Sequence, residues 1–356
     1  MALLFMDSFG GYATADIPTR WAGGTGGGCT IVNTPLPPNS QSGAQVLSNA
    51  GGTYVLNNNF GAKARMIVGT RFYRFHSGGS SGVVLSCSTV PSLGQLDGVV
   101  LVQVSNSGTF ITDSSGNILG SGPVVPYQEW HHYELDATFG LAGTATLKLY
   151  MDGNPTPFIS VVGTTAYATA SSFVLGGGAY TVHSNQPPDQ GYYADFYAFD
   201  GTGAAPFNAA LAPQGLGAAK MAFAVPTAPG IISNWTANGA ATIWQCIDQI
   251  PQDGDTTYAS DATPGDQYQV TFGALPAMQT LIGVQLSTYA RTDDAGPRAY
   301  QSGFYKGGTY GYSGVNQFLG GTYNYIEDEF MTNPVTGLAW AVGDLTGLQF
   351  GAKLTV

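Results

Sequence analysis

The chain has 356 residues, of which 51 are glycine and 20 are proline, and only 9% of its residues are charged. Soluble domains ordinarily contain roughly 25% charged residues, so the Glu, Lys and Arg that favour helices are scarce and a mainly helical protein is disfavoured. A hydrophobic content of 44%, with 20 Tyr and 18 Phe, supplies a large core and excludes global disorder.

The net charge and the apolar runs of the sequence predict which partners and which cellular location are expected. The net charge is −11 and the sequence has no dense Lys/Arg cluster, so we expect no nucleic-acid partner. Residues 1–7 contain no basic stretch and only a short apolar run, which predicts no signal peptide. No apolar run approaches the ~20 residues of a membrane span, so we expect no membrane insertion.

Three cysteines, Cys29, Cys87 and Cys246, are far apart in the sequence. They have no C-x-x-C spacing, so a cysteine-based zinc site is not expected. We predict buried, reduced thiols, as is usual for a protein made in the cytosol.

Most of the chain breaks into short runs in which apolar residues alternate with other residues. Residues 64–68, 98–104 and 144–151 are examples, and turn-forming residues separate them. Such runs predict short antiparallel strands in a sandwich. Glycines interrupt the one stretch with a helical period, residues 209–223, so no long helix is expected.

A domain boundary is predicted near residue 205. Residues 196–199 resemble a closing strand, and the small residues that follow in 200–206 suit a connection. Strand-like alternation restarts at residues 220–225. The sequence therefore predicts one domain over residues 1–205 and a smaller, β-rich domain over residues 206–356.

The first domain contains a pattern of aromatic and turn residues, made by Trp130, Tyr150, Asp152, Gly153 and Asp195. On these residues it resembles the concanavalin A-like lectin and glucanase jelly rolls, which include laminin-G domains. In that family the paired strands carry a core aromatic residue, and Asp-Gly is a preferred hairpin turn. The resemblance implies an all-β jelly-roll sandwich over about residues 1–200.

A second set of residues is spread in order along the whole chain: residues 3–12 with Trp21, and residues 250–258, 284–285, 291–298 and 333–340. On these residues the chain resembles tailed-bacteriophage virion proteins that begin with such a jelly roll. This resemblance implies a capsid-surface or tail component that is assembled in the host cytoplasm and contacts other virion proteins.

The sequence argues against a glycanase. The related glucanases place three carboxylates at alternate positions of one strand, with the outer pair about 6.6 Å apart. Here the matching positions are Glu134, Asp136 and Thr138, so one of the two catalytic groups is missing. We expect Glu134 and Asp136 to face solvent and predict no catalytic residue.

Metal binding is expected to be absent, with Ca²⁺ as the most reasonable ion if one binds. The acidic loops at Asp189, at 253–255 and at 293–294 fit ordinary polar turns better than a dedicated calcium loop. The carboxylates of residues 327–329 are expected to keep an edge strand soluble. Adjacent His131 and His132 point to opposite faces of a strand, so they cannot share a metal.

Tyrosines of the second domain are the candidates for contact with a glycan or with a protein partner. They alternate along two short stretches and comprise Tyr305, Tyr310, Tyr312, Tyr323 and Tyr325. Tyrosine at such positions suits sugar stacking and subunit packing equally.

The composition and the resemblances together predict a non-enzymatic structural protein of a phage virion, displayed on the capsid or tail as a homo-oligomer. Low charge and many aromatic side chains favour large interfaces, because few charges need desolvation. The alternative is a glycan-binding, receptor-recognition protein of the particle that binds a host-surface glycan. A glycosidase is a third and weaker interpretation, given Thr138.

Overall fold

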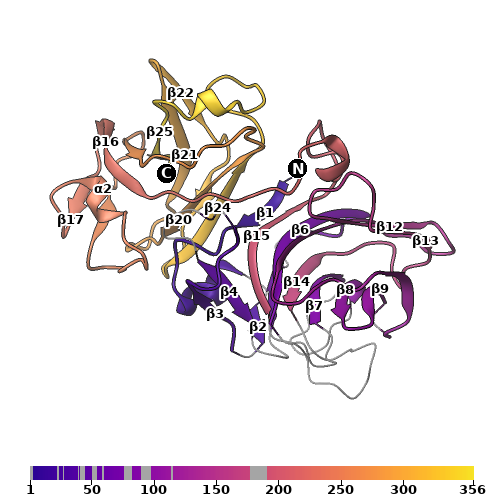
Figure 1. Cartoon of the computed structure of the whole chain (residues 1–356). Coiled ribbons are helices and arrows are strands. Elements are labelled where there is room, and N and C mark those ends of the chain that lie inside the picture. The colour runs from indigo at the N-terminus through magenta and orange to yellow at the C-terminus, as the bar shows by residue number, and fades with distance from the viewer. Residues whose placement is uncertain are drawn as a thin grey trace. The chain divides into compact units, whose positions relative to one another are not determined.

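The computed structural model describes residues 3–21, 24–26, 28–38, 40, 45–49, 54–57, 60–75, 82–89, 98–113, 115–176 and 191–356. The chain divides into two compact units (Figure 1). Unit 1 comprises Met1–Gly10 and Thr14–Met221, and unit 2 comprises Gly11–Ala13 and Ala222–Val356.

Unit 1 contains two antiparallel sheets. The strands of the first sheet are β1 (Leu3–Asp7), β3 (Thr30–Val32), β4 (Val46–Asn49), β6 (Arg65–Arg74), β11 (Trp130–Thr138), β12 (Ala145–Met151), β13 (Ile159–Gly163) and β15 (Gly191–Phe199). They pair in the order β13-β12-β11-β6-β15-β4-β3, with β1 on β15. This sheet carries the polar face described below.

The second sheet of unit 1 lies against the first. Its strands are β2 (Gly24–Gly26), β5 (Tyr54–Asn57), β7 (Gly82–Ser88), β8 (Gly98–Ser105), β9 (Gly108–Thr112), β10 (Ile118–Gly122) and β14 (Ser172–Gly176). They pair in the order β10-β9-β8-β7-β14-β5-β2. Figure 1 shows β12 and β13 in one layer and β7, β8 and β9 in the other.

Aromatic side chains fill the core between the two sheets. Phe173 of β14 and Phe196 of β15 have ring centroids 4.6 Å apart, which joins the sheets. Trp21 packs against both rings, at 5.9 Å and 5.3 Å. Strands account for 46% of the structure and helices for 6%. The predicted all-β jelly-roll sandwich with a second β-rich unit is confirmed.

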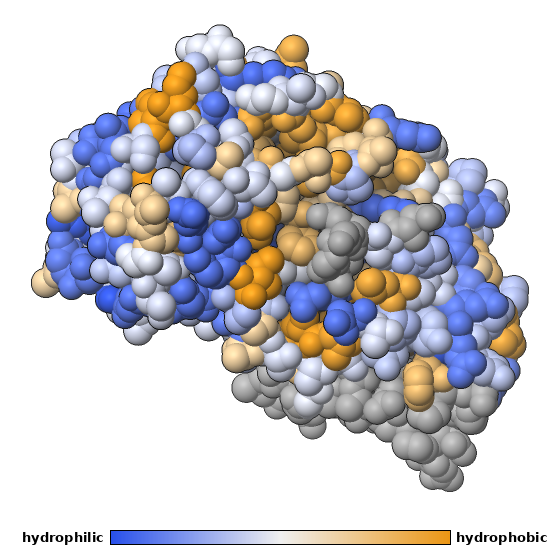
Figure 2. Space-filling model, turned by 60° about the vertical axis from the view of Figure 1, so that its left-hand side comes forward, coloured by the Kyte–Doolittle hydropathy of each residue, from blue (hydrophilic) through white to orange (hydrophobic). Residues whose placement is uncertain are grey.

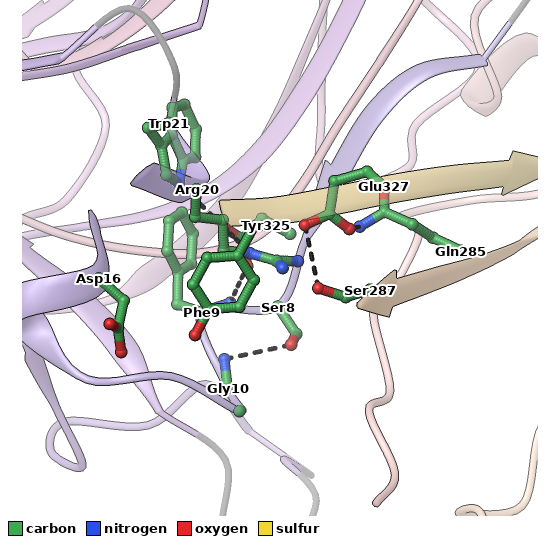
Figure 3. Close-up of polar contacts among 12 residues, drawn as sticks. Ser8, Phe9, Gly10, Asp16, Arg20, Trp21, Gln285, Ser287, Tyr325 and Glu327 are labelled. Atoms are coloured by element: carbon green, nitrogen blue, oxygen red, sulfur yellow. Dashed lines mark hydrogen bonds and ion pairs between the residues drawn. The ribbon is translucent and has the colours of Figure 1, made fainter. Parts of the chain in front are cut away.

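The N-terminal strand is anchored by the buried carboxylate of Asp7. Trp21 Nε1 and Arg20 Nε donate to Asp7 Oδ2 at 2.9 Å and 3.2 Å, and the Phe9 backbone N–H donates to Oδ1 at 2.7 Å (Figure 3). A buried charge needs such partners. These contacts among residues 7–21 therefore hold the N-terminal strand in place within unit 1.

The segment 206–221 crosses the outer face of the first sheet. Phe207 packs on Phe199 at 5.9 Å, and the backbone N–H groups of Leu211 and Ala212 donate to Glu134. The backbone N–H of Met221 then donates to Asp195 of β15. These contacts place the segment with unit 1, so the units divide after residue 221 rather than at the predicted residue 205.

Unit 2 is built on one larger sheet and two strand pairs. Its strands are β16 (Pro226–Ser233), β17 (Thr236–Asn238), β18 (Tyr258–Ser260), β19 (Gln267–Phe272), β20 (Val284–Ala290), β21 (Ala299–Lys306), β22 (Thr309–Tyr312), β23 (Gln317–Phe318), β24 (Asn324–Phe330) and β25 (Gln349–Leu354). The larger sheet has the order β16-β19-β25-β21-β22, with β23 on β21. β17 pairs with β18, and β20 pairs with β24.

One face of the larger sheet is apolar and packs against the β20–β24 pair. Phe304 of β21 contacts Phe330 of β24 at 4.5 Å and Trp340 at 5.9 Å, and Leu348 completes this buried cluster. Because side chains alternate along a strand, the other face of the same sheet carries the remaining positions. That face is polar.

Helices are short in the described part of the chain. They are α1 (Ile17–Arg20) and α2 (Ile243–Cys246), with 3-10 turns η1 (Thr14–Asp16), η2 (Ala212–Gln214) and η3 (Val342–Asp344). The expectation of no long helix is confirmed for these residues. No helix among them is long and apolar enough to cross a membrane. The three cysteines are buried and form no disulfide bond, as predicted.

Candidate functional site

The hairpin β21–β22 brings together three of the predicted tyrosines. Gly307 and Gly308 form its two-residue turn, with φ of +58° and +92°, and Lys306 faces Thr309 across it. Positive φ at both turn residues matches the twist of a hairpin and favours glycine. This register places Tyr305 directly opposite Tyr310.

We call the polar face of the larger sheet the Tyr–Gln face. Three cross-strand rows form it, because strands β19, β25, β21 and β22 pair in register. The first row is Gln267, Lys353 and Gln301; the second is Gln269, Gly351, Gly303 and Tyr312; the third is Gln349, Tyr305 and Tyr310.

The tyrosine rings of this face contact one another. The ring centroids of Tyr305 and Tyr310 are 4.8 Å apart. Those of Tyr310 and Tyr312 are 6.3 Å apart, and their planes are within 6° of parallel. Tyr310 is 36% exposed, whereas the other two rings are half-buried. The tyrosines therefore form one continuous aromatic surface with an exposed edge.

The glutamines of the face hold defined orientations. The Tyr312 hydroxyl donates to Gln267 Oε1, and Gln301 Nε2 donates to Asn316 Oδ1 at 3.0 Å. The backbone N–H of Ile231 donates to Gln349 Oε1 at 2.7 Å. Each bond uses either the oxygen or the nitrogen of a side-chain amide. The other atom stays available for a hydrogen bond with a ligand, because an amide has both donor and acceptor atoms.

Gln269 lies at the centre of the face, beside the two glycines. Its side chain is near Gly303 and under Gly230, and the residue is only 2% exposed. Both polar atoms of its amide, Oε1 and Nε2, are buried without a hydrogen-bond partner in the structure. A buried polar group without a partner lowers the free energy of unfolding by about 1–3 kcal/mol.

The face carries no carboxylate at the ten positions of its three rows. Its single charged side chain is Lys353, whose Nζ lies 5.1 Å from the ring centroid of Tyr312. A chain with 22 acidic residues thus presents amides, phenols and one ammonium group there.

Tyr323 and Tyr325 lie apart from the Tyr–Gln face, against Tyr289 of β20. Tyr323 stacks on Tyr289 at 4.9 Å, and its hydroxyl donates to Asp255 at 2.7 Å. Tyr325 is only 8% exposed and donates its hydroxyl to Gln252. The five predicted tyrosines therefore fall into two groups, and Tyr325 packs inside unit 2.

The residues of the jelly-roll resemblance lie on the first sheet of unit 1. Trp130 opens β11 and is half-buried against Tyr73 at 5.6 Å, while Tyr150 of β12 is buried opposite Glu134. Asp152 and Gly153 have φ of +52° and +73° and begin the turn after β12. The structure thus places Trp130 on the outer face of the sheet.

Asp195 lies at a bulge in β15, with φ of +53°. Its carboxylate pairs with Arg71 Nε at 2.9 Å and accepts the backbone N–H of Met221 at 2.8 Å. Burial raises its pKa, although Arg71 and the bond from Met221 oppose the shift. Its contacts within unit 1 hold the end of segment 206–221.

Glu134 does not face solvent as the sequence predicted. It is fully buried beneath segment 206–221, where it accepts bonds from Leu211 N at 2.8 Å, Ala212 N at 3.1 Å and the Tyr197 hydroxyl at 2.7 Å. Burial raises its pKa, and these three bonds oppose that shift. The expectation was wrong because the alternation of strand residues gives no information about a later segment that covers the face.

The polar side chains around Glu134 also make contacts that stabilise the fold. Arg65 donates two bonds to Asp136, at 2.8 Å and 2.7 Å. Burial, aided by the nearby Arg71, lowers the pKa of His132 to about 3, so its ring is neutral. Glu134 uses three of the about four acceptor positions of a carboxylate for bonds with Tyr197, Leu211 and Ala212. This network serves to hold segment 206–221.

The adjacent histidines point to opposite faces of β11. The His131 ring contacts Asp152 Oδ2 through Nδ1 at 2.8 Å, whereas the His132 ring stacks on Tyr197 at 5.9 Å. His76 and His183 lie outside the described residues. The predicted divergence of His131 and His132 is confirmed.

The acidic loops that were candidates for Ca²⁺ use their carboxylates locally. Asp253 accepts the backbone N–H of Thr257 at 3.2 Å, Asp255 pairs with Arg291 at 2.9 Å, and Asp294 pairs with Arg298 at 2.6 Å. Asp189 lies outside the described residues. Among the residues that are described, no cluster of three or more His, Cys, Asp or Glu could hold a metal ion.

The acidic residues of β24 have partners on both sides of the strand. Glu327 accepts bonds from Gln285 Nε2 at 2.8 Å and from Ser287 Oγ at 3.0 Å (Figure 3). Asp328 points the other way, is buried and accepts bonds from Ser302 and Gln317. These carboxylates therefore stabilise the strand pairs of unit 2.

No protein-family model and no curated protein sequence matches the chain. Several solved structures do. An endo-β-1,4-glucuronan lyase from the fungus Trichoderma reesei matches at 13% identity over 48% of this chain and 86% of that chain, with a TM-score of 0.34. A galectin-like protein of unknown function from Bacillus subtilis matches at 10% identity over 56% and 96%, with a TM-score of 0.35. Domain 4 of a Geobacillus stearothermophilus arabinanase matches at 13% identity over 54% and 82%, with a TM-score of 0.34.

These matches contradict the predicted function of a structural protein of a phage virion. The matched structures are a polysaccharide lyase, an arabinanase domain and a protein with a galectin-like fold. Nothing in them supports a capsid or tail protein. The TM-scores near 0.35 describe a distant likeness of fold. The predicted virion location, homo-oligomer and lack of enzymatic activity stay predictions.

The contacts of Asp152 predict an acid-dependent contribution to stability. Burial alone would raise its pKa, but hydrogen bonds from the His131 ring and the His132 backbone hold the pKa below the ordinary 3.8. The carboxylate therefore stabilises the folded state above about pH 4, and this stabilisation is lost as the pH falls through the lowered pKa. Because Asp152 is half-exposed, the contribution is less than about 1 kcal/mol.

Asp152→Asn tests this contribution while keeping a residue that tolerates the left-handed turn conformation. Urea midpoints measured from pH 7 to pH 2 should show the variant less stable at neutral pH and equal to the natural protein in acid. A difference that stays constant over the whole range would refute the role of the charge.

Proposed function

We propose that this chain binds carbohydrate through the Tyr–Gln face of unit 2. The observation that carries the proposal is the register of β19, β25, β21 and β22, which sets three tyrosines beside four glutamines on one sheet face. Sugars present apolar C–H faces and rings of hydroxyl groups. Aromatic rings pack on the former, and amides pair with the latter.

The composition of the face favours a sugar over a protein partner. Protein interfaces gather apolar anchors in a dry centre, whereas the centre of this face holds Gln269, Gly303 and Gly351. The exposed Phe318 lies at the end of this face, because it pairs with Ala299 of β21, two residues before Gln301. Figure 2 shows hydrophobic and hydrophilic areas interspersed over the visible surface. The Tyr–Gln face therefore offers a polar, aromatic surface that suits a glycan.

A polysaccharide-binding assay tests the proposal. The purified full chain is run through native gels that contain xylan, mannan, dextran, hydroxyethylcellulose, alginate or polygalacturonate, beside gels without polysaccharide. We expect at least one polysaccharide to retard the protein, and free oligosaccharide of that type to reverse the retardation. Unchanged mobility in every gel, with a folded protein by circular dichroism, would refute carbohydrate binding.

A further inference from the structure

Strand β21 of the Tyr–Gln face has two short strands along one of its edges. On one side, β25 pairs with residues 300–305 of β21. On the other side, β22 pairs with residues 303–306 and β23 pairs with residues 299 and 300. Because a strand has only two hydrogen-bonding edges, β22 and β23 lie one after the other beside β21.

Three aromatic residues follow one another along this edge. Tyr310, Tyr312 and Phe318 pair with positions 305, 303 and 299 of β21. These positions alternate along the strand, and residues directly opposite each other point to the same face, so all three side chains lie on the Tyr–Gln face. The line from position 299 to position 305 is about 20 Å long. Its two ends are accessible, because Tyr310 is 36% exposed and Phe318 is 67% exposed.

Amide groups occupy the gap between the tyrosines and Phe318. The gap is at position 301 of β21, where Gln301 Nε2 donates to Asn316 Oδ1 at 3.0 Å. Asn316 is exposed and Gln301 is half-buried. Their bond leaves Gln301 Oε1 as an acceptor and Asn316 Nδ2 as a donor for a ligand. The hydroxyl groups of a sugar can both donate and accept, so they can pair with these two atoms.

The length of this line distinguishes two forms of glycan ligand. A site for one terminal sugar gathers its aromatic and polar groups around a single ring. Here the same groups follow one another over about 20 Å, which is several times the width of a sugar ring. A single sugar can therefore contact Tyr310 or Phe318 but not both.

We propose that the ligand is a linear glycan chain that lies along β22 and β23, with several consecutive sugars between Tyr310 and Phe318. The outer sugars pack on the aromatic rings, and hydroxyl groups of the sugars between them pair with the amides of Gln301 and Asn316. This inference rests on the proposed function, since it assigns the form of the ligand that the same face binds.

A series of oligosaccharides tests the length of the site. Affinities of the full chain are measured by isothermal titration for the monosaccharide to the hexasaccharide of the polysaccharide that retards the protein. We expect the hexasaccharide to bind about a hundredfold more tightly than the disaccharide, because a disaccharide misses the amides and one aromatic end, each worth about tenfold. A monosaccharide or disaccharide that binds as tightly as the hexasaccharide would overturn the inference and leave carbohydrate binding intact. No binding to any chain of the panel would overturn both.

The substitution Phe318→Ala tests the far end of the line. The variant should bind the hexasaccharide about tenfold more weakly, and the last sugars of the series should no longer raise its affinity. The matched control is Leu338→Ala, because Leu338 is also an apolar residue of unit 2 and is 69% exposed, but belongs to no strand of the face. The control should bind every oligosaccharide as the natural chain does. Equal affinities of the two variants for the hexasaccharide would overturn the extension of the site to Phe318.

Discussion

Replacement of Tyr310 by Ala should weaken glycan binding about tenfold, and replacement of Tyr305 and Tyr310 together about a hundredfold. Tyr310 is the most exposed ring of the Tyr–Gln face and touches both Tyr305 and Tyr312. An aromatic contact is worth about 0.5–1.5 kcal/mol beyond its buried area, and 1.4 kcal/mol corresponds to a tenfold change in affinity. Isothermal titration with the retarding oligosaccharide measures the loss.

The matched control for this prediction is Tyr258→Ala. Tyr258 belongs to the β17–β18 pair of the same unit and is 38% exposed, against 36% for Tyr310. Its removal should leave the affinity unchanged. The two single variants should lower the melting temperature by similar amounts, because Tyr258 and Tyr310 are exposed to a similar extent. Equal losses for Tyr258→Ala and Tyr310→Ala would mean that the binding site lies elsewhere.

Replacement of Glu134 by Ala should lower the free energy of unfolding of unit 1 by about 3 kcal/mol. The carboxylate accepts bonds from Leu211 N, Ala212 N and the Tyr197 hydroxyl, all in a buried site. Its removal leaves three buried donors without an acceptor, and each such donor lowers the free energy of unfolding by about 1–3 kcal/mol. Urea denaturation followed by tryptophan fluorescence measures the loss, and amide exchange over residues 206–221 should become faster.

Asp136→Ala is the matched control for Glu134→Ala. Asp136 lies two residues further along the same strand and pairs with Arg65, but that pair is partly exposed. Exposed pairs contribute only about 0.2–1 kcal/mol. A loss at Glu134 no larger than the loss at Asp136 would refute the anchoring of segment 206–221. Catalysis by Glu134 would instead show as lost turnover in a stably folded variant.

The sequence predicted the all-β class because its strand and turn signals are local. Alternation of apolar residues marks one face of each strand, and Gly307-Gly308 or Asp152-Gly153 marks a turn. The hairpin of Tyr305 with Tyr310 could be anticipated in the same way. The partners of a strand could not, because pairing across the sheet joins residues as distant as Gln269 and Gly351.

The four glutamines were missed for this reason, although a signal for them exists. Gln267 and Gln269 alternate with apolar residues, as do Gln349 and Lys353, so each pair lies on one face of its strand. Only the register of β19, β25 and β21 shows that these faces are the same one. The burial of Glu134 was hidden similarly, since a segment more than 70 residues later covers it.

Hydrogen–deuterium exchange of the full chain, with and without a saturating oligosaccharide from the binding panel, tests the site most directly. If the Tyr–Gln face binds the sugar, exchange should slow in peptides that cover β21 and β22, residues 299–312, and β25, residues 349–354. Peptides of β17 and β18 should stay unchanged. Protection confined to residues 65–74 and 130–138 of unit 1 would contradict the account, because the bound glycan would then lie on the other unit.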